Sequence, residues 1–498
     1  MSTNALTIGG FDLGTHTCEA SHITQSSLAK PAGMAEGGTS LRSVVYFEDG
    51  ETPVAGQEAE NLLLADPANG VRHWKRSMGS DKVLHTTPSG RAWTAEDIAQ
   101  FLLETCKASI EAEIGRVVQA AVISVPANYT DDQKSATIRA GEAAGFDHVD
   151  LIHEPTSASI SFLGNNEREA PDGLRIIFDE GGGTLDISIC EKRGNRYEIK
   201  TTSGVPALGG MDYTQKLYDH CVSEFRSSGG SFDEDSDLDA AADLWRRVET
   251  GKINLNGLEK VSIPVLAGSH KHLVTITKDE ARQLWKPLGD QMLACLRTTL
   301  DEIEVELGDI LELIPVGGGS QCFYVQEELA SFFGRPISDH SDPIHAVANG
   351  AALHAWTRHD EVDVGGGIIL PSPDYKVRDV TAHGLGVMAL DGKLAESFSV
   401  VLKKGVALPS CFSKTFQMHE DGATDALIEL YQGQSGQDIS SCAKLGNFEL
   451  QGLPPVFGRP HKIEIEFRID ENGMVNASAR DMESGKCEEL AVAYQRAT

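Results

Sequence analysis

The sequence predicts an α/β part of two related halves over residues 1–363, a linker over 364–376, and an all-β sandwich over 377–498. Two observations support this prediction. An apolar run that enters an aspartate, a glycine turn and a threonine occurs at residues 10–15 and again at 177–184. After the glycine-rich stretch 363–367, helical spacing gives way to alternating apolar and polar residues.

The predicted elements of the α/β part are each bounded by a cap, a turn or a proline. They are a hairpin over residues 6–23, a helix that starts at Thr94, a strand over 120–125, a helix over 131–144, a hairpin over 174–190 and a strand over 311–316. In the all-β part, Asn472-Gly473 and Ser484-Gly485-Lys486 are predicted turns between strands.

The bulk composition excludes several classes of protein. The formal charge is −31, from 43 basic and 74 acidic residues, which disfavours nonspecific binding to nucleic acid or to an anionic membrane. The nine cysteines show no CxxC pair, so free thiols in a reducing compartment are expected. No secretory segment opens the chain, and no apolar run approaches the ~20 residues of a membrane span. A cytoplasmic location is therefore expected.

The two repeated turns carry the chemistry that the sequence predicts. A glycine turn can bring backbone N–H groups close to phosphate oxygens. The aspartates beside the turns, Asp12 and Asp179, are suited to hold Mg²⁺ through water molecules. Either turn alone is more often an ordinary hairpin. Together with a third turn at residues 316–320, the pair predicts a nucleotide site, although a tight strand–helix connection explains the third turn equally well.

Two further residues are candidates because of their surroundings. Glu154 follows an apolar strand and is either a carboxylate aimed at the metal or a charge at a helix N-terminus. Lys75 is either a surface lysine or a group that reaches the terminal phosphate. The histidines form no metal-ligand array, and His16, His153 and His345 are interpreted as ordinary polar positions.

Over nearly its whole length the chain resembles the 70-kDa heat-shock chaperone family, whose ATPase domain has the actin/hexokinase-type fold of two duplicated lobes. The matching motifs lie at residues 11–15, 124–127, 153–156, 178–186, 208–210, 350–352, 445–448, 452–455 and 469–473. The resemblance implies a chaperone that binds ATP or ADP with Mg²⁺ and belongs to the stress-response proteins. It also implies two kinds of partner, a J-domain co-chaperone and unfolded or nascent polypeptides.

The resemblance also implies roles for individual residues. The catalytic residues would be Asp12, Lys75, Glu154, Asp179 and Asp186, with Asp12, Glu154 and Asp179 holding Mg²⁺ through waters. The nucleotide-binding residues would be Gly14, Thr15, Gly181, Gly182, Gly183, Thr184, Gly209, Gly210, Glu249, Lys252, Gly318, Gly319 and Ser320. Pro126 corresponds to a proline switch, and Lys134 stands where an arginine usually couples the two domains. The peptide groove would contain Val387, Leu390, Phe416, Ala426 and Ile428, which fit a sandwich core at least equally well.

The sequence departs from the family pattern at three places. Ile253 and Cys322 replace arginines near the adenine, and Asn256 replaces a serine, so weaker nucleotide binding is expected. Residues 375–379 lack the family's leucine-rich linker, and no helical lid is expected after the β region. These departures are similar to those of the short heat-shock-70-like partner of a zuotin-type J-domain protein in the ribosome-associated complex.

Two functions from different classes therefore remain open. The chain is an ATPase, weak or vestigial, that cycles on unfolded polypeptides, or it is a nucleotide-stabilised scaffold that works through its partner without hydrolysis. The intact phosphate-site residues favour the first function, whereas the linker and the missing lid favour the second. A sugar or glycerol kinase on the same ATPase fold is a distant third.

Overall fold

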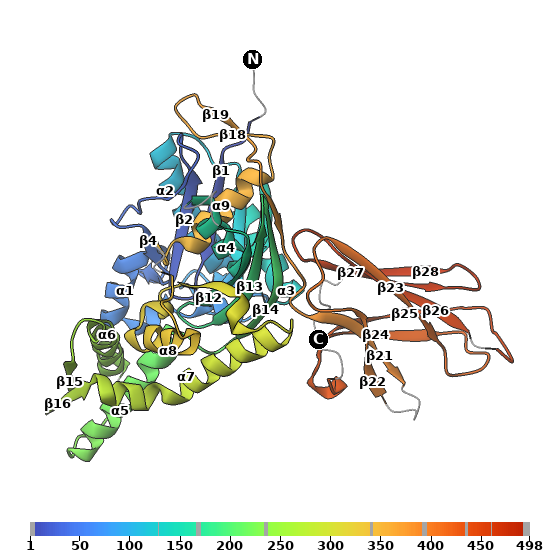
Figure 1. Ribbon diagram of the computed structural model, residues 1–498. Helices are drawn as coiled ribbons and strands as arrows, with labels where there is room; N and C mark the ends of the chain where they lie inside the picture. The colour runs from blue at the N-terminus through green and yellow to red at the C-terminus, as the bar shows by residue number, and fades with distance from the viewer. Residues whose placement is uncertain are drawn as a thin grey trace. The chain divides into compact units, whose positions relative to one another are not determined.

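The computed structural model describes residues 5–127, 129–165, 171–233, 238–338, 342–390, 396–433, 437–459 and 461–491 (Figure 1). The chain divides into two compact units. The N-terminal unit comprises Met1–Ala127, Ala136–Tyr197 and Thr202–Val377, and the C-terminal unit comprises Asn128–Ser135, Glu198–Thr201 and Arg378–Thr498.

The first half of the N-terminal unit is built on a mixed sheet. Its central strand β1 (Ile8–Leu13) forms an antiparallel hairpin with β2 (Thr17–Ile23) and pairs in parallel with β10 (Ala120–Val125). The remaining strands are β11 (His148–His153), which pairs with β10, and β3 (Ala29–Pro31) and β4 (Ser40–Arg42), which pair with β2. The predicted hairpin and the predicted strand over 120–125 are confirmed.

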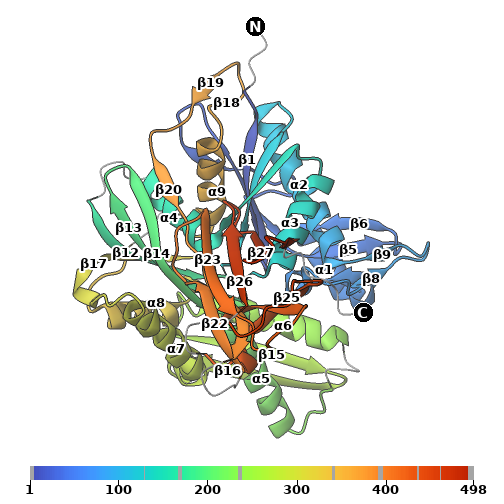
Figure 2. The same cartoon turned by 90° about the vertical axis from the view of Figure 1, so that its right-hand side faces the viewer.

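The second half repeats this arrangement. Strand β12 (Gly173–Glu180) forms a hairpin with β13 (Leu185–Arg193) and pairs in parallel with β17 (Ile310–Val316). Strands β14 (Arg196–Val205) and β20 (Lys376–Arg378) extend the sheet beyond β13, and Figure 2 shows β12, β13 and β14 side by side. Each half therefore ends its central strand in a glycine turn, as the repeated sequence pattern predicts.

Helices surround these sheets. They are α1 (Gly56–Ala65), α2 (Ala95–Ile114), α3 (Asp131–Ala143), α4 (Glu154–Asn165), α5 (Gly210–Ser227), α6 (Leu238–Asn254), α7 (Lys278–Asp301), α8 (Phe323–Phe333) and α9 (Ala346–Thr357). The smaller strands are β5 (Val45–Glu48), β6 (Thr52–Ala55), β7 (Gly70–Val71), β8 (His85–Thr86), β9 (Ala92–Trp93), β15 (Lys260–Ala267) and β16 (His270–Thr277).

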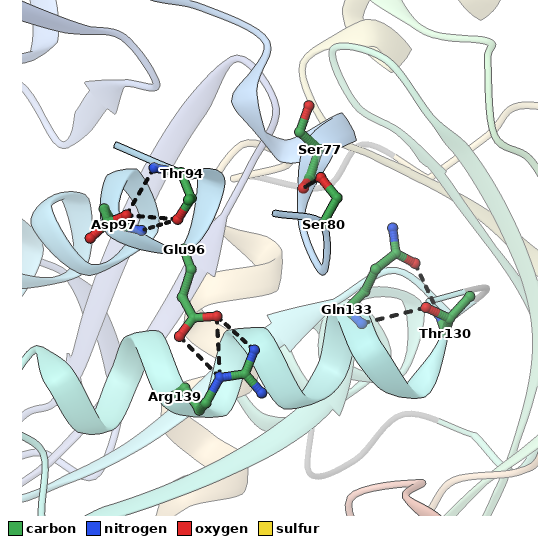
Figure 3. Close-up of polar contacts among 8 residues, drawn as sticks. All are labelled: Ser77, Ser80, Thr94, Glu96, Asp97, Thr130, Gln133 and Arg139. Atoms are coloured by element: carbon green, nitrogen blue, oxygen red, sulfur yellow. Dashed lines mark hydrogen bonds and ion pairs between the residues drawn. The ribbon is translucent and has the colours of Figure 1, made fainter. Parts of the chain in front are cut away.

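The start of α2 shows how local sequence fixes an element. The Thr94 backbone N–H donates to Asp97 Oδ2 at 2.8 Å, and the Asp97 N–H donates to Thr94 Oγ1 at 3.4 Å, which completes the predicted capping box (Figure 3). In the same first turn, Glu96 Oε2 accepts a hydrogen bond from Arg139 Nη2 on α3 at 2.6 Å (Figure 3). The helix ends at Gly115, whose φ of 67° favours glycine.

The stretch predicted as a linker is folded into the N-terminal unit. Strands β18 (Glu361–Asp363) and β19 (Ile369–Pro371) form an antiparallel hairpin. Its turn contains Gly365, Gly366 and Gly367, each with φ between 62° and 80°. Ile368, Leu370, Tyr375 and Val377 pack against the core of the first sheet. The glycines are thus a hairpin turn, and residues 364–376 are not a free connection. The assignment of domains to these boundaries stays a prediction.

The C-terminal unit contains two antiparallel sheets. One has the strand order β22 (Glu396–Leu402), β21 (Gly384–Leu390), β24 (Ala426–Gly433) and β25 (Ala443–Leu450). The other has the order β23 (Ser410–Gln417), β26 (Lys462–Ile469), β27 (Val475–Asp481) and β28 (Cys487–Ala491). Leu430 and Leu450 of the first sheet and Phe467 of the second are fully buried in one shared core. The alternation predicted along β26 and the turns after β26 and β27 are confirmed.

A polar cluster at the end of β27 supports the second sheet. Asp481 is buried and accepts hydrogen bonds from His461 Nε2 at 2.7 Å and from the N–H and hydroxyl of Ser484. Burial alone would raise the pKa of Asp481, but the hydrogen bonds outweigh it and lower the pKa to about 2. The charged carboxylate therefore stabilises the fold above its unfolded-state pKa of ~4, and this contribution is lost as the pH falls toward 2.

Asp481→Asn is expected to destabilise β26 and β27 in a pH-dependent way. The free energy of unfolding is expected to fall by about 2–3 kcal/mol at pH 7 and by about 1 kcal/mol near pH 3, because the pKa of Asp481 is lower in the folded state than in the unfolded state. Hydrogen exchange of the peptides that cover the two strands, measured at both pH values, reports this loss of stability. Glu488→Gln, at an exposed carboxyl on β28, provides the control and leaves exchange unchanged. An equal loss at both pH values would contradict this account.

Candidate functional site

One cavity of about 650 Å³ lies in the N-terminal unit, where the glycine turns of the two halves meet. Its volume is within the range of small-molecule and cofactor sites. The predicted residues that line it are Asp12, Gly14, Thr15, Lys75, Glu154, Asp179, Gly181, Gly182, Thr184, Gly210, Glu249, Lys252, Gly318 and Gly319. Gly183, Asp186, Gly209 and Ser320 were also predicted but do not line the cavity. They lie behind its wall.

The first wall of the cavity is acidic and contains one lysine. Lys75 lies in the 3₁₀ turn η2 (Trp74–Ser77), and its Nζ donates to Glu154 Oε1 at 2.8 Å. Both side chains are almost completely buried. Of the alternatives that the sequence left open, the structure therefore excludes a surface position for Lys75. Glu154 begins α4, and its carboxyl faces the cavity.

The aspartates of the two turns are held next to this ion pair. Asp12 Oδ1 accepts the Ser124 hydroxyl at 2.7 Å. Burial and then the charge of Glu154 raise the pKa of Asp12 to about 6. Burial, followed by the charges of Glu154 and Asp186, raises the pKa of Asp179 well above its usual value. Like charges that crowd a buried site in this way favour a bound cation.

Asp186 lies behind the acidic wall and interacts with its carboxyl groups through charge. It lies opposite Asp179 in the β12–β13 hairpin and is buried. Burial and the charge of Glu154 raise the pKa of Asp186 to about 8. Its charge therefore interacts with the acidic wall although its side chain does not line the cavity.

The acidic wall fits Mg²⁺ bound through water molecules. Among the described residues, no group of three or more histidine, cysteine, aspartate or glutamate side chains is arranged to ligate a metal directly. Mg²⁺ usually keeps several waters and takes only one or two protein carboxylates. Asp12, Glu154 and Asp179 would hold the hydrated cation, which would also relieve the repulsion between their charges.

The second wall is a loop clamped by backbone hydrogen bonds. The N–H groups of Gly210 and Met211 donate to the carbonyl oxygens of Gly181 at 3.0 Å and Gly182 at 2.7 Å. This contact is possible because Gly209 has no side chain. A Cβ on Gly209 would lie 2.6 Å from the Gly183 nitrogen and 2.8 Å from the Gly182 carbonyl carbon. Gly209 therefore shapes the loop from behind.

The far end of the cavity is built by α6 and the third glycine turn. Lys252 Nζ donates to the Gly210 carbonyl oxygen at 2.6 Å, and burial lowers the pKa of Lys252. Burial opposes ionisation of Glu249, but the hydrogen bond from His16, followed by the charges of His16 and Arg42, lowers the pKa of Glu249 to about 2. Glu249 is thus a fixed carboxylate at this end of the cavity.

The three substituted positions are also at this end. Ile253 is 55% exposed and lines the cavity. Cys322 lines it too, and burial raises the pKa of its thiol to about 11. Asn256 Oδ1 accepts the N–H of Phe323, the first residue of α8, at 2.9 Å. Ser320 does not reach the cavity, because its hydroxyl donates to the Gly317 carbonyl at 2.8 Å.

Several residues of the cavity were missed by sequence reasoning. His16 lines the cavity, bonds Glu249 Oε1 at 2.9 Å and contacts Arg42, so this polar position has a place in the site that the sequence did not predict. Glu19 lines the cavity opposite Asp12 in the β1–β2 register, and burial raises its pKa to about 8. The hairpin pairing could have identified Glu19. No sequence signal identifies Arg42, which comes from β4.

The remaining predicted residues lie elsewhere. Pro126 follows β10, and Lys134 is on α3 with its Nζ 4.0 Å from Asp131. In the C-terminal unit Val387 and Ile428 belong to the core, which agrees with the sandwich-core interpretation. Phe416 and Ala426 are partly buried against that core, and Leu390 is 46% exposed. The assignment of these five residues to a peptide groove stays a prediction.

Two general expectations concern the whole chain. All nine cysteines are free thiols, as the sequence predicted. Within the described residues, no helix is long and apolar enough to cross a membrane.

Comparison with known proteins agrees with the cavity and the fold. A family model described as "Hsp70 protein" matches residues 8–497. The chaperone protein DnaK of Methanothermobacter thermautotrophicus is 31% identical over 97% of this chain and 79% of that protein. The DnaK proteins of Cenarchaeum symbiosum and Nitrosopumilus maritimus are 31% and 30% identical over 96% of this chain, and over 71% and 74% of their own lengths. Members of the matched family are ATPases that use ATP and ADP with Mg²⁺. The chain belongs to the Hsp70 family.

Proposed function

We propose that the protein is an ATP-binding chaperone that hydrolyses ATP and assists unfolded or nascent polypeptides together with a J-domain partner in the cytoplasm. The observation that supports this is the single cavity that gathers both glycine turns, the acidic wall and Lys75. An inert scaffold does not need a buried lysine held at 2.8 Å from Glu154, because burying such a pair costs desolvation energy.

At the phosphate end of the cavity, different residues would have different roles. The clamped loop at Gly181 and Gly182 would present backbone N–H groups to the phosphates, with the Thr15 and Thr184 side chains beside them. Lys75 Nζ would stabilise charge on the terminal phosphate, and its hydrogen bond fixes the Glu154 carboxylate. The Ser124 hydroxyl fixes the orientation of Asp12. Mg²⁺, when bound, supplies charge neutralisation for the phosphates.

The far end of the cavity favours a second candidate function. With Ile253 and Cys322 in place of two arginines, the base would lose stacking and cation–π energy of ~1 kcal/mol or more. Together with residues 375–379, which lack a leucine-rich linker, this supports a nucleotide-stabilised co-chaperone of a ribosome-associated complex that seldom hydrolyses ATP.

Gly209→Ala is expected to weaken ADP binding at least tenfold. The new methyl group would meet the backbone of residues 181–183 and push the loop out of position. Gly318→Ala provides the matched control, since Gly318 lines the same cavity but a Cβ there meets nothing within 4 Å. Calorimetric titration with ADP and Mg²⁺ measures both variants. Equal affinities for Gly209→Ala and the wild type would show that the loop does not hold the phosphates.

Lys75→Ala is expected to slow single-turnover ATP hydrolysis by about 10²–10³-fold, because it removes a donor aimed at the developing charge. The measurement is made with and without a J-domain. Lys82→Ala, which removes an exposed lysine nearby, leaves the rate unchanged. A wild-type chain that binds ATP but does not hydrolyse it would reject the ATPase proposal and favour the scaffold.

Ile253→Arg is expected to tighten ADP binding about fivefold, since an arginine plane against the base contributes ~1 kcal/mol. Binding of inorganic tripolyphosphate, which has no base, is measured by the same calorimetry and remains unchanged. If the affinities for ADP and for tripolyphosphate increase equally, the arginine acts only through its charge, and Ile253 does not lie at the base.

A further inference from the structure

A second, smaller cavity of about 340 Å³ lies in the N-terminal unit beside the nucleotide cavity. It is formed by the segment after β7, the first turns of α5, and α6. Its lining residues are Arg72, His73, Arg76, Met211, Asp212, Gln215 and Trp245. Met211 also lines the nucleotide cavity, so this one side chain borders both spaces.

The cavity contains two arginines that form no ion pair with the residues that the structure describes, although the charge of Arg76 acts on Asp212. Neither Arg72 nor Arg76 forms an ion pair or a side-chain hydrogen bond with any residue that the structure describes. Arg72 Nε is shielded from solvent and has no acceptor. In a chain with 74 acidic and 43 basic residues, carboxylates are abundant. The buried Arg72 Nε would gain an acceptor from a bound anion, and the exposed Arg76 borders the same space, so the two guanidinium groups favour an anion from outside the chain.

The other charged groups of the cavity leave it positive. Asp212 is its one carboxyl, and Asp212 Oδ2 already accepts the Gly209 N–H at 2.9 Å as part of the α5 cap. Burial and the charges of Arg72 and Arg76 lower the pKa of His73, which favours the neutral imidazole at neutral pH. The two arginines therefore exceed the one carboxylate by a single positive charge. Planar guanidinium groups match the oxygens of a tetrahedral oxyanion such as phosphate.

The cavity lies directly behind the loop that would hold the nucleotide's phosphates. A Cβ built on Gly183 would lie 3.4 Å from Arg76 Nη2 and 3.0 Å from Met211 Cε. Arg76 Nη2 and the flexible end of Met211 therefore lie against this loop at Gly183. Methionine side chains repack readily, so a small movement of Met211 would join the two cavities. The N–H groups of Gly210 and Met211 already donate to the loop, so they are not available to an anion in this cavity.

We propose that the cavity between Arg72, His73 and Arg76 binds inorganic phosphate and receives the phosphate that ATP hydrolysis releases in the neighbouring cavity. The second half of this statement rests on the proposed function, whereas phosphate binding itself does not.

The first test is a calorimetric titration of inorganic phosphate into the full chain saturated with Mg²⁺ and a non-hydrolysable ATP analogue. The analogue fills the position of the terminal phosphate, so a remaining phosphate site must lie elsewhere. One such site is expected, and Arg72→Gln/Arg76→Gln weakens it at least tenfold. Arg246→Gln, which removes an exposed arginine of α6 next to Trp245, leaves it unchanged. A wild-type protein without this site, or a double variant that keeps it, overturns the proposal.

Failure of the two proposals can be told apart. If the analogue does not bind, the proposed nucleotide function fails. The same phosphate titration without nucleotide then still tests the cavity through the arginine variants.

The second test identifies the source of the phosphate. ATP cleavage in a single turnover is followed by chemical quench, and free phosphate is followed by a fluorescent phosphate-binding reporter. Phosphate is expected to appear later than ADP in the wild type. Arg72→Gln is expected to shorten this delay at least threefold while leaving the cleavage rate unchanged. An unchanged delay would show that the site takes phosphate from solution, and the product-receiving role would be wrong.

Discussion

The burial of four carboxyl groups around one ammonium group is the constraint on which the cavity depends. Asp12 and Asp179 come from the two central strands, Glu154 from the start of α4 and Asp186 from the strand paired with β12. Lys75 compensates only part of this charge, through Glu154. The pKa values of Asp12, Asp179 and Asp186 are raised because the negative charge that remains is buried and uncompensated. A hydrated divalent cation with a polyphosphate is a group that would balance it.

The two ends of the cavity differ in how strictly the fold determines them. At the phosphate end, backbone hydrogen bonds from α5 and the close approach of Gly209 fix the loop without help from the ligand. At the other end, Glu249 is fixed by His16 and Arg42, while Ile253 is largely exposed and contributes no polar contact. A bound nucleotide would therefore meet a loop fixed by backbone contacts at its phosphates and a surface with fewer polar contacts at its base. Nucleotide binding and ATP hydrolysis therefore have to be measured separately for this chain.

The sequence predicted those parts of the site whose signal is local. A glycine turn, its aspartate and its threonine are adjacent in the chain, so both hairpins and the part of the cavity lining that these turns supply could be predicted. Glu19 could be found only by pairing β1 with β2 in the predicted hairpin, and Arg42 could not be found, because its place arises from the pairing of β2 with the distant β4. The glycines of residues 365–367 were interpreted as a linker because composition alone does not distinguish a flexible connection from the turn of a hairpin. The same limit applies to Val387 and Ile428, since an apolar residue on a strand fits a groove and a core equally well.

The central claim is that the buried carboxyl cluster is the cation site of a nucleotide cavity. Equilibrium titration of the full chain with ADP, in the presence of Mg²⁺ and in the presence of a chelator, tests it most directly. The account predicts one site per chain, with an affinity at least tenfold higher when Mg²⁺ is present. The absence of saturable binding, or equal affinities with and without Mg²⁺, would contradict it.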